Sequence, residues 1–194
     1  MLGSNSKQNK AVNVRLVLAQ IATQGPISRA DIARNTFLSK QTITNQVDEL
    51  IALQLVMEAG IKKEKVGKPS TMLRLQDQYY FTLGLRLWPD RVEMALCSLT
   101  GHILQQQSWP LPAQEQLNSC RMLVEQLCQR QGISYQQLLG VGMTQITESH
   151  ASLMHKQQQR QLFQQQLASA LQLPVVAEQT AAACAAYHLL HGEA

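Results

Sequence analysis

The sequence predicts an α+β protein of two units: three helices closed by a β-hairpin, and then a longer unit of strands and helices. Two observations predict it. Up to about residue 76, apolar residues recur at helical spacing and are followed by two short strand-like segments around a basic loop. From residue 77 onward, three strand-like segments precede helices that alternate with further strands. We therefore expect domains at residues 1–76 and 77–194.

The first helix is expected over residues 10–23, because apolar side chains fall on one of its sides at helical spacing. The residues expected on that side are Val12, Leu16, Ala19 and Ile21. Gly25 and Pro26 then interrupt the pattern, and both residue types end helices.

A second, short helix is expected to begin after Ser28 and to end near Asn35. Ser28 is a favourable N-cap, and Asp31 places a carboxylate in the first turn, where the helix dipole favours negative charge. The residues expected to face the core are Ile27, Ile32 and Ala33. The tripeptide from residue 36 to 38 makes the turn into the third helix.

The third helix is expected to start at Ser39 as its N-cap and to bury a stripe made of Ile43, Val47 and Leu50. Its other side carries polar side chains near the N-terminus: Ser39, Lys40, Gln41, Thr42 and Asn45. A recognition helix presents such side chains to base edges in the major groove of DNA, where Gln and Asn pair bidentately with adenine. An ordinary solvated helix face is the alternative.

A basic hairpin is expected next, with strands at residues 55–58 and 71–75. The loop between them holds Gly60 and Gly67 and four lysines: Lys62, Lys63, Lys65 and Lys68. Such a loop can follow phosphates or enter a minor groove. Helix, turn, helix and basic hairpin are the layout of a winged helix-turn-helix, so these lysines join the polar residues of the third helix as candidate DNA contacts.

Charge divides unevenly along the chain. Up to residue 75 there are eleven lysines and arginines and five aspartates and glutamates, a net charge of +6, so the total of +4 leaves −2 for the remainder. A basic first unit on a mildly acidic remainder favours a polyanionic partner for the first unit. A solvated basic face without a partner is the alternative.

The amino-acid composition limits the classes of protein to which this chain can belong. The chain has 194 residues, of which 45% are hydrophobic, as in soluble globular proteins. No apolar run approaches the roughly 20 residues that span a bilayer, and the N-terminus lacks the apolar core of a signal peptide, so we expect a cytoplasmic protein. The cysteines form no Cys-x-x-Cys pair and are expected to be reduced and buried; they are Cys97, Cys120, Cys128 and Cys184.

The second unit should begin with three strands at residues 80–87, 91–98 and 102–109. An amphipathic helix over 114–130 follows, and its expected inward residues are Leu117, Met122, Leu123, Leu127 and Cys128. The remaining expected elements are a strand at 138–143, a helix at 156–171, a strand at 175–176 and an alanine-rich helix at 180–190. This order suits one lobe of an actin-like, ribonuclease-H-like fold.

Three motifs of the first unit resemble the DNA-binding domain of ROK-family transcription regulators, the sugar-responsive family of the NagC, Mlc and xylose repressors. They are Pro-Ile-Ser-Arg-Ala-Asp-Ile-Ala from residue 26, Leu-Ser-Lys-Gln-Thr-Ile-Thr from residue 38, and Gly67-Lys68-Pro69. Winged helices of the MarR type share part of this pattern. In the second unit, Leu-Gly-Val-Gly-Met from residue 139 is similar to the family's Gly-Ile-Gly strand. The resemblance implies an actin-like ROK lobe and binding of double-stranded DNA.

The chain departs from the ROK kinases at two motifs. Their Asp-x-Gly-Gly-Thr phosphate loop is replaced by Arg-Leu-Trp-Pro-Asp at residues 86–90, without a glycine whose backbone amides cradle phosphate. Their Asn-Asp pair is replaced by Gln179-Thr180, which removes the expected catalytic base. The second lobe and the family's cysteine-rich zinc motif do not follow before Ala194. We expect a truncated, degenerate ROK-like lobe with no catalytic residue, no enzyme activity and no cofactor.

The histidines do not indicate a metal site. His150 and His155 lie five residues apart and His188 and His191 three apart, with no Cys or Asp nearby to complete a ligand set. Glu178 is the residue that the resemblance leaves as a candidate ligand for a sugar hydroxyl.

The patterns of the first unit predict a sequence-specific DNA-binding transcription regulator, and the resemblance to the ROK family implies a repressor of a carbohydrate-related operon. Winged-helix regulators bind two-fold symmetric sites, so we expect a homodimer. One alternative is a regulator that still binds a sugar effector in its second unit. Another is a fragment of a longer ROK repressor. A sugar kinase is disfavoured by the missing phosphate loop and the missing acid.

Overall fold

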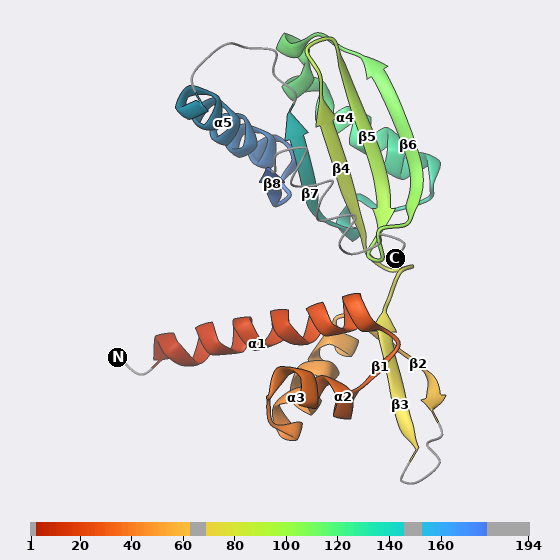
Figure 1. The fold of residues 1–194 in the computed structure, drawn as a ribbon. Helices are drawn as coiled ribbons and strands as arrows, with labels where there is room; N and C mark the ends of the chain where they lie inside the picture. Colours follow the sequence, from red (N-terminus) through yellow and green to blue (C-terminus); the bar gives the residue numbers. More distant parts are fainter. Residues whose placement is uncertain (1–2, 63–68, 146–152, 178–194) are drawn as a thin grey trace. The chain divides into compact units, whose positions relative to one another are not determined.

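The computed structural model describes residues 3–62, 69–145 and 153–177 of the 194-residue chain. The chain divides into two compact units, Met1–Tyr79 and Tyr80–Ala194 (Figure 1). Within the described residues, none of the helices has the length and apolar character that crossing a membrane requires.

The first unit contains three helices and a small antiparallel sheet. The helices are α1 (Gly3–Gln24), α2 (Arg29–Thr36) and α3 (Lys40–Ala52). The strands are β1 (Ile27–Ser28), β2 (Val56–Lys62) and β3 (Ser70–Leu75), in the order β1-β3-β2. The three predicted helices are confirmed. The strand β1 was not predicted, because two residues carry no strand pattern of their own and pair only through contact with β3.

The predicted buried side of α1 is confirmed for Ile21 and wrong for Val12, Leu16 and Ala19, which are exposed. Val17 and Ile21 are buried, at 0% and 2% exposure, whereas Val12 is 54% and Leu16 44% exposed. The side of α1 that carries Val17 and Ile21 packs against the rest of the unit. Apolar residues occupy both sides of this helix, and its own sequence does not say which side meets α2 and α3.

The strand β2 extends further than predicted and includes Gly60 and Lys62, which were assigned to the loop. A bulge between Glu58 and Ile61 makes this extension compatible with pairing to β3. Gly60 lies in the bulge with φ +97°, a backbone conformation that glycine adopts without strain. Lys62 therefore pairs with Ser70 at the far end of the hairpin ladder.

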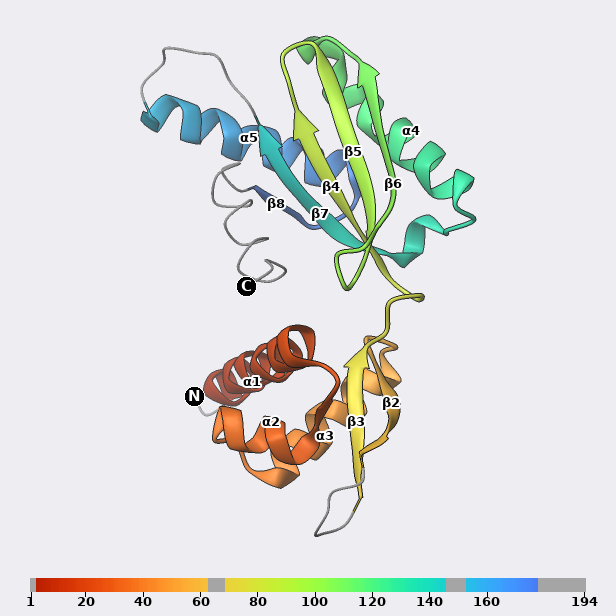
Figure 2. The ribbon, with the colours of Figure 1, turned by 45° about the vertical axis from the view of Figure 1, so that its right-hand side comes forward.

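The second unit is a five-stranded sheet with helices on one face (Figure 2). Its strands are β4 (Phe81–Leu87), β5 (Arg91–Ser98), β6 (Ile103–Pro110), β7 (Leu138–Gln145) and β8 (Val175–Ala177). Its helices are α4 (Ala113–Arg130), the short 3-10 helix η1 (Tyr135–Gln137) and α5 (Leu153–Leu171). The order is β6-β5-β4-β7-β8, in which β6, β5 and β4 are antiparallel and β4, β7 and β8 parallel.

Alternate residues of the central strands form the core of the second unit. Leu83, Leu85 and Leu87 of β4 are buried against α4 and α5, which contribute residues such as Leu127 and Leu167. Met122 was predicted to face inward but is 53% exposed. It lies about 200° around α4 from Cys120, on the side opposite the buried stripe. The predicted helix at 180–190 lies outside the described residues.

The cysteine prediction is confirmed for Cys120 and Cys128, which are free and buried. Burial raises the pKa of the Cys120 thiol to about 12, so this group stays protonated at neutral pH. Cys97 is free and half-buried. Cys184 lies outside the described residues.

Gln116 is a buried polar residue that joins three segments of the second unit. Its amide nitrogen donates to the carbonyl oxygens of Trp88, Leu111 and Arg91, at 2.7, 3.0 and 3.4 Å. The side chain is 3% exposed, so water does not replace these bonds easily. Gln116 thereby ties the hairpin between β4 and β5 to the segment that leads into α4.

Gln116→Leu is expected to lower the free energy of unfolding of the second unit by about 1 to 3 kcal/mol, since carbonyl oxygens lose their donor while the volume is nearly kept. Both tryptophans, Trp88 and Trp109, belong to this unit, so urea unfolding followed by tryptophan fluorescence measures it. Gln114→Leu, at an exposed position on the same helix, is the control. Equal midpoints for both variants would contradict the structural role.

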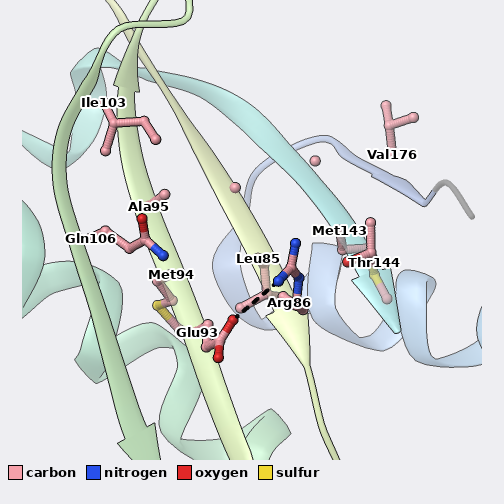
Figure 3. Close-up of a pocket in the computed structure, with 12 residues that line it drawn as sticks. Leu85, Arg86, Glu93, Met94, Ala95, Ile103, Gln106, Met143, Thr144 and Val176 are labelled. Atoms are coloured by element: carbon pink, nitrogen blue, oxygen red, sulfur yellow. Dashed lines mark ion pairs between the residues drawn. The ribbon is translucent and has the colours of Figure 1, made fainter. Parts of the chain in front are cut away.

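The sheet face away from the helices is hollowed. A depression of about 400 Å³ is lined by small and apolar residues that include Gly84, Ala95 and Gly142 (Figure 3). Arg86 of β4 and Glu93 of β5 point toward one another across it, with Nη1 and Oε2 3.5 Å apart. The hollow is a concave surface with few polar groups, as small-molecule sites often are.

Candidate nucleic-acid interface

The N-terminus of α3 is held by side-chain capping. Ser39 precedes the helix with extended backbone angles, and its Oγ accepts a hydrogen bond from the backbone N of Thr42 at 3.1 Å. The hydroxyls of Ser39 and Thr42 are also 2.9 Å apart. The predicted cap is thereby confirmed, and Ser39 and Thr42 have structural roles whether or not they touch a ligand.

Gln41 and Asn45 form an exposed amide pair on the outer side of α3. Gln41 Nε2 donates to Asn45 Oδ1 at 2.8 Å, one helical turn along. Both residues are exposed, and Lys40 beside them is exposed as well. The bond limits the rotamers of both amides and leaves the Asn45 amide nitrogen and the Gln41 oxygen directed to other partners. The pair can therefore donate and accept at one place, which adenine recognition requires.

Below this exposed side, α3 is anchored in the first unit. Ile43, Val47 and Leu50 are buried as predicted, at 0%, 0% and 1% exposure. Gln46 is buried too, at 6%. The anchoring means that α3 moves with the core of the unit.

An acidic residue on the outer side of α3 was missed by the sequence reasoning. Asp48 is exposed and follows Gln41 and Asn45 at the i, i+4, i+7 spacing of one helix side. A carboxylate there repels phosphate, but Arg29 Nη2 at the start of α2 donates to Asp48 Oδ1 at 3.0 Å. Arg29 also lies 3.9 Å from Glu58 of β2. The helical spacing alone identifies Asp48, whereas the pairing with Arg29 required the fold.

The lysines of the hairpin are only partly described. Lys62 is exposed at the end of β2. Lys63, Lys65 and Lys68 lie outside the described residues, and so does Glu178 in the second unit. The structure therefore brings together Ser39, Lys40, Gln41, Thr42 and Asn45 on one end of α3, and it adds Lys62 on the hairpin of the same unit.

Among the described residues, no three His, Cys, Asp or Glu side chains gather as metal ligands do. His150, His188 and His191 lie outside the described part, and nothing is described of the His155 side chain.

Asp31 in the first turn of α2 has two partners that stabilise its charged form. Its Oδ2 accepts a 2.7 Å hydrogen bond from Ser28 Oγ, and its Oδ1 pairs with Arg34. The Ser28 hydroxyl, followed by the Arg34 guanidinium, holds the pKa of this carboxyl below its ordinary value. The lowered pKa means that the ionised form stabilises the first unit.

This stabilisation is expected above the unfolded-state pKa of about 4 and is lost as pH falls through the lower folded-state pKa. At pH 7, Asp31→Asn should therefore unfold at a lower temperature than the parent, and its free energy of unfolding should be lower by less than about 1 kcal/mol. On acidification to pH 3, the variant should lose less of its free energy of unfolding than the parent does. Far-UV circular dichroism melts between pH 7 and pH 3 measure both. Parallel pH curves for parent and variant would refute the assignment.

Comparison with known proteins finds similar transcription regulators. The chain is 33% identical over 98 residues to the xylose repressor of Bacillus spizizenii (strain ATCC 23059 / NRRL B-14472 / W23). It is 30% identical over 111 residues to the DNA-binding transcriptional repressor Mlc of Escherichia coli (strain K12). These matches cover 50% and 57% of this chain. In fold, the chain matches the crystal structure of a ROK-family transcriptional regulator, a homologue of E. coli Mlc, with a TM-score of 0.71.

The chain is similar to the ROK-family transcriptional regulators. The predicted resemblance is thereby confirmed. The structural match to the ROK regulator covers 95% of this chain and 50% of that protein at 20% identity, and it establishes the mixed α/β fold with its sheet. No protein-family model matches the chain.

The similarity to ROK regulators concerns part of their length. The chain spans 26% of the Bacillus xylose repressor and 27% of Mlc, and a xylose repressor of Staphylococcus xylosus matches 90% of this chain over 48% of its own length, at 27% identity. Where the ROK kinases have a phosphate loop, this chain has a hairpin in which Trp88 N donates to Arg91 O at 2.9 Å. The Arg91 guanidinium stacks 4.0 Å from the centroid of the Trp88 ring.

Proposed function

We propose that residues 1–76 form a winged helix-turn-helix that binds double-stranded DNA, with α3 as the recognition helix and the β2–β3 hairpin as the wing. The observation that carries this proposal is the exposed Gln41–Asn45 amide pair beside the capped N-terminus of α3, with Lys40 next to it. Side chains at this end of a recognition helix meet base edges in the major groove. The net charge of +6 over the first 75 residues supports a polyanionic partner.

In this proposal one set of residues contacts bases and another contacts phosphates. Gln41 and Asn45 read bases, while lysines contact phosphates; the lysines are Lys40, Lys62, Lys63, Lys65 and Lys68. Ser39 and Thr42 cap the helix, and their hydroxyls lie at the same end. Arg29 offsets the charge of Asp48, so that this carboxylate does not repel the duplex.

We propose further that the chain is a transcription repressor of a carbohydrate-related operon and acts as a homodimer. Its relatives are named xylose repressors, Mlc and the dual regulator NagC, which supports the class of target. One recognition helix reads too few base pairs for tight specific binding, and two copies on an inverted repeat double the contacts. Sedimentation of the full chain is expected to show a dimer at micromolar concentration; a monomer well above that range contradicts this part.

Selection of bound duplexes from a random pool tests the DNA-binding proposal. The expected result is enrichment of an inverted repeat whose half-sites are centred about 10 base pairs, or a multiple of that, apart. The same experiment reports half-site sequence and spacing. A pool that stays random after repeated rounds refutes sequence-specific binding.

A second candidate function is effector binding by the second unit, as part of a sugar-responsive regulator. The hollow on the sheet face away from α4 and α5 favours it, and Val176, which lines the hollow, precedes Glu178 by two residues in the sequence. Thermal unfolding followed by tryptophan fluorescence in the presence of xylose, glucose or N-acetylglucosamine tests this function. A higher melting temperature of the second unit with one of these sugars supports effector binding. An unchanged melting temperature with all three refutes it for these sugars. We propose no catalytic role, and an ATPase assay checks that.

A further inference from the structure

Phe37 is the most exposed of the large apolar side chains in the described residues, at 94%. It follows α2 as its C-cap and stands two residues before Ser39, the N-cap of α3. A ring in this state contributes almost no apolar burial to the first unit. Packing in the core of the first unit therefore does not explain a phenylalanine at this position.

The turn itself does not need a phenylalanine. Thr36 Oγ1 donates to Ile32 O at 2.7 Å and accepts from Leu38 N at 3.4 Å, so the Thr36 hydroxyl holds the backbone on both sides of Phe37. Leu38 supplies the half-buried apolar side chain of the turn. The backbone of Phe37 has φ 58° and ψ 18°, a left-handed conformation that favours glycine or asparagine over a bulky residue. Folding alone therefore favours a smaller residue here.

The surroundings of the ring indicate what it meets. It lies at the same end of α3 as Lys40 and Gln41, and both of these side chains are exposed. Arg34, in the last turn of α2, is 74% exposed. Exposed basic residues thus precede and follow the apolar ring in the chain, with Arg34 paired to Asp31. This composition suits a ligand that combines phosphates with an apolar patch. The thymine C5-methyl group in the major groove of DNA is such a patch, and phenylalanine is among the residues that contact it.

We propose that Phe37 contacts a thymine methyl group next to the bases met by α3, and so sets part of the sequence preference. This inference rests on the proposed DNA-binding function. It adds a base contact made by an apolar side chain to the polar contacts of Gln41 and Asn45. The contact carries no charge, which distinguishes it in experiment from the lysine contacts.

The test uses the full chain, the duplex selected from the random pool and fluorescence anisotropy over a range of salt concentrations. Phe37→Ala is expected to bind about tenfold more weakly while the slope of log affinity against log salt stays the same, because no phosphate contact is lost. Phe37→Gly, which suits the left-handed backbone, should lose binding equally and melt no lower than the parent. Leu53→Ala removes a 51% exposed apolar side chain at the other end of α3 and should bind like the parent.

Deoxyuridine in place of each thymine in turn removes one methyl group at a time. At one position the parent chain should lose severalfold in affinity, and Phe37→Ala should lose nothing further there, as expected of two groups in contact. Lack of coupling at every thymine overturns the proposed contact, and so does equal binding by parent and Phe37→Ala. Failure of the parent chain to prefer any duplex is a different result, because it refutes the proposed function itself.

Discussion

Replacement of Gln41 and Asn45 by alanine is expected to remove most of the sequence preference of the chain and to leave its binding to arbitrary DNA unchanged. Each bidentate amide contact to a base contributes about 1 to 3 kcal/mol, so each single variant should lose roughly tenfold to hundredfold on the selected duplex. The lysines remain, so non-specific affinity and its salt dependence should persist.

The two changes are not expected to be additive. Gln41 Nε2 donates to Asn45 Oδ1 at 2.8 Å, so the loss of either side chain frees the other to turn. The double variant should therefore lose less than the sum of the two single losses in binding free energy. Gln114 and Asn118 form an exposed pair of the same spacing on α4, and their replacement by alanine is the matched control. Equal loss of specific and non-specific binding would refute base reading by this pair.

Gly25→Ala is expected to destabilise the first unit strongly and to leave the second unit unchanged. A Cβ at Gly25 would lie 2.5 Å from the carbonyl oxygen of Ile21, the atom that also accepts the Gly25 amide at 3.0 Å. The Ile21 oxygen is a backbone atom, and a Cβ is fixed in place by the backbone of residue 25. The clash is therefore relieved only by moving the end of α1. Overpacking of this kind costs about 3 kcal/mol, which lowers the melting temperature of a unit this size by roughly 12 to 24 °C.

Two optical probes separate the units in this test. Both tryptophans of the chain belong to the second unit, so tryptophan fluorescence follows that unit, while far-UV circular dichroism follows both. The variant should show an earlier transition in circular dichroism and an unchanged one in fluorescence. Gly142→Ala is the control, because a Cβ there meets nothing within 4 Å. A circular dichroism transition that stays in place would show that the clash is absorbed at no cost.

Local signals predicted most elements of the first unit and the chemistry of its candidate interface. Ser28 and Ser39 cap α2 and α3 because a hydroxyl beside a helix start bonds the free amides of the first turn, wherever the helix is placed. In the second unit, the alternating pattern of residues 91–98 predicted a strand, and the structure confirms it as β5. Such signals depend on neighbours in the sequence, so they can be read without the fold.

The errors occurred where a choice depends on distant residues. On α1 the structure buries Val17 and leaves Leu16 exposed, and on α4 it leaves Met122 exposed. A helix with apolar residues on two sides is compatible with either orientation, and packing against other elements selects one. The pairing of Arg29 with Asp48 spans 19 residues and was invisible for the same reason.

The sequence by itself determined the three helices and the hairpin of the first unit, which side chains cap α2 and α3, and which polar and basic residues gather near the start of α3. Only the tertiary structure decided which face of each helix is buried, that Gln41 and Asn45 bond to each other, and that Phe37 is exposed. The physical reason is that caps and turns are made by residues close in the chain, whereas burial and side-chain pairing are set by the surfaces that meet when distant elements pack.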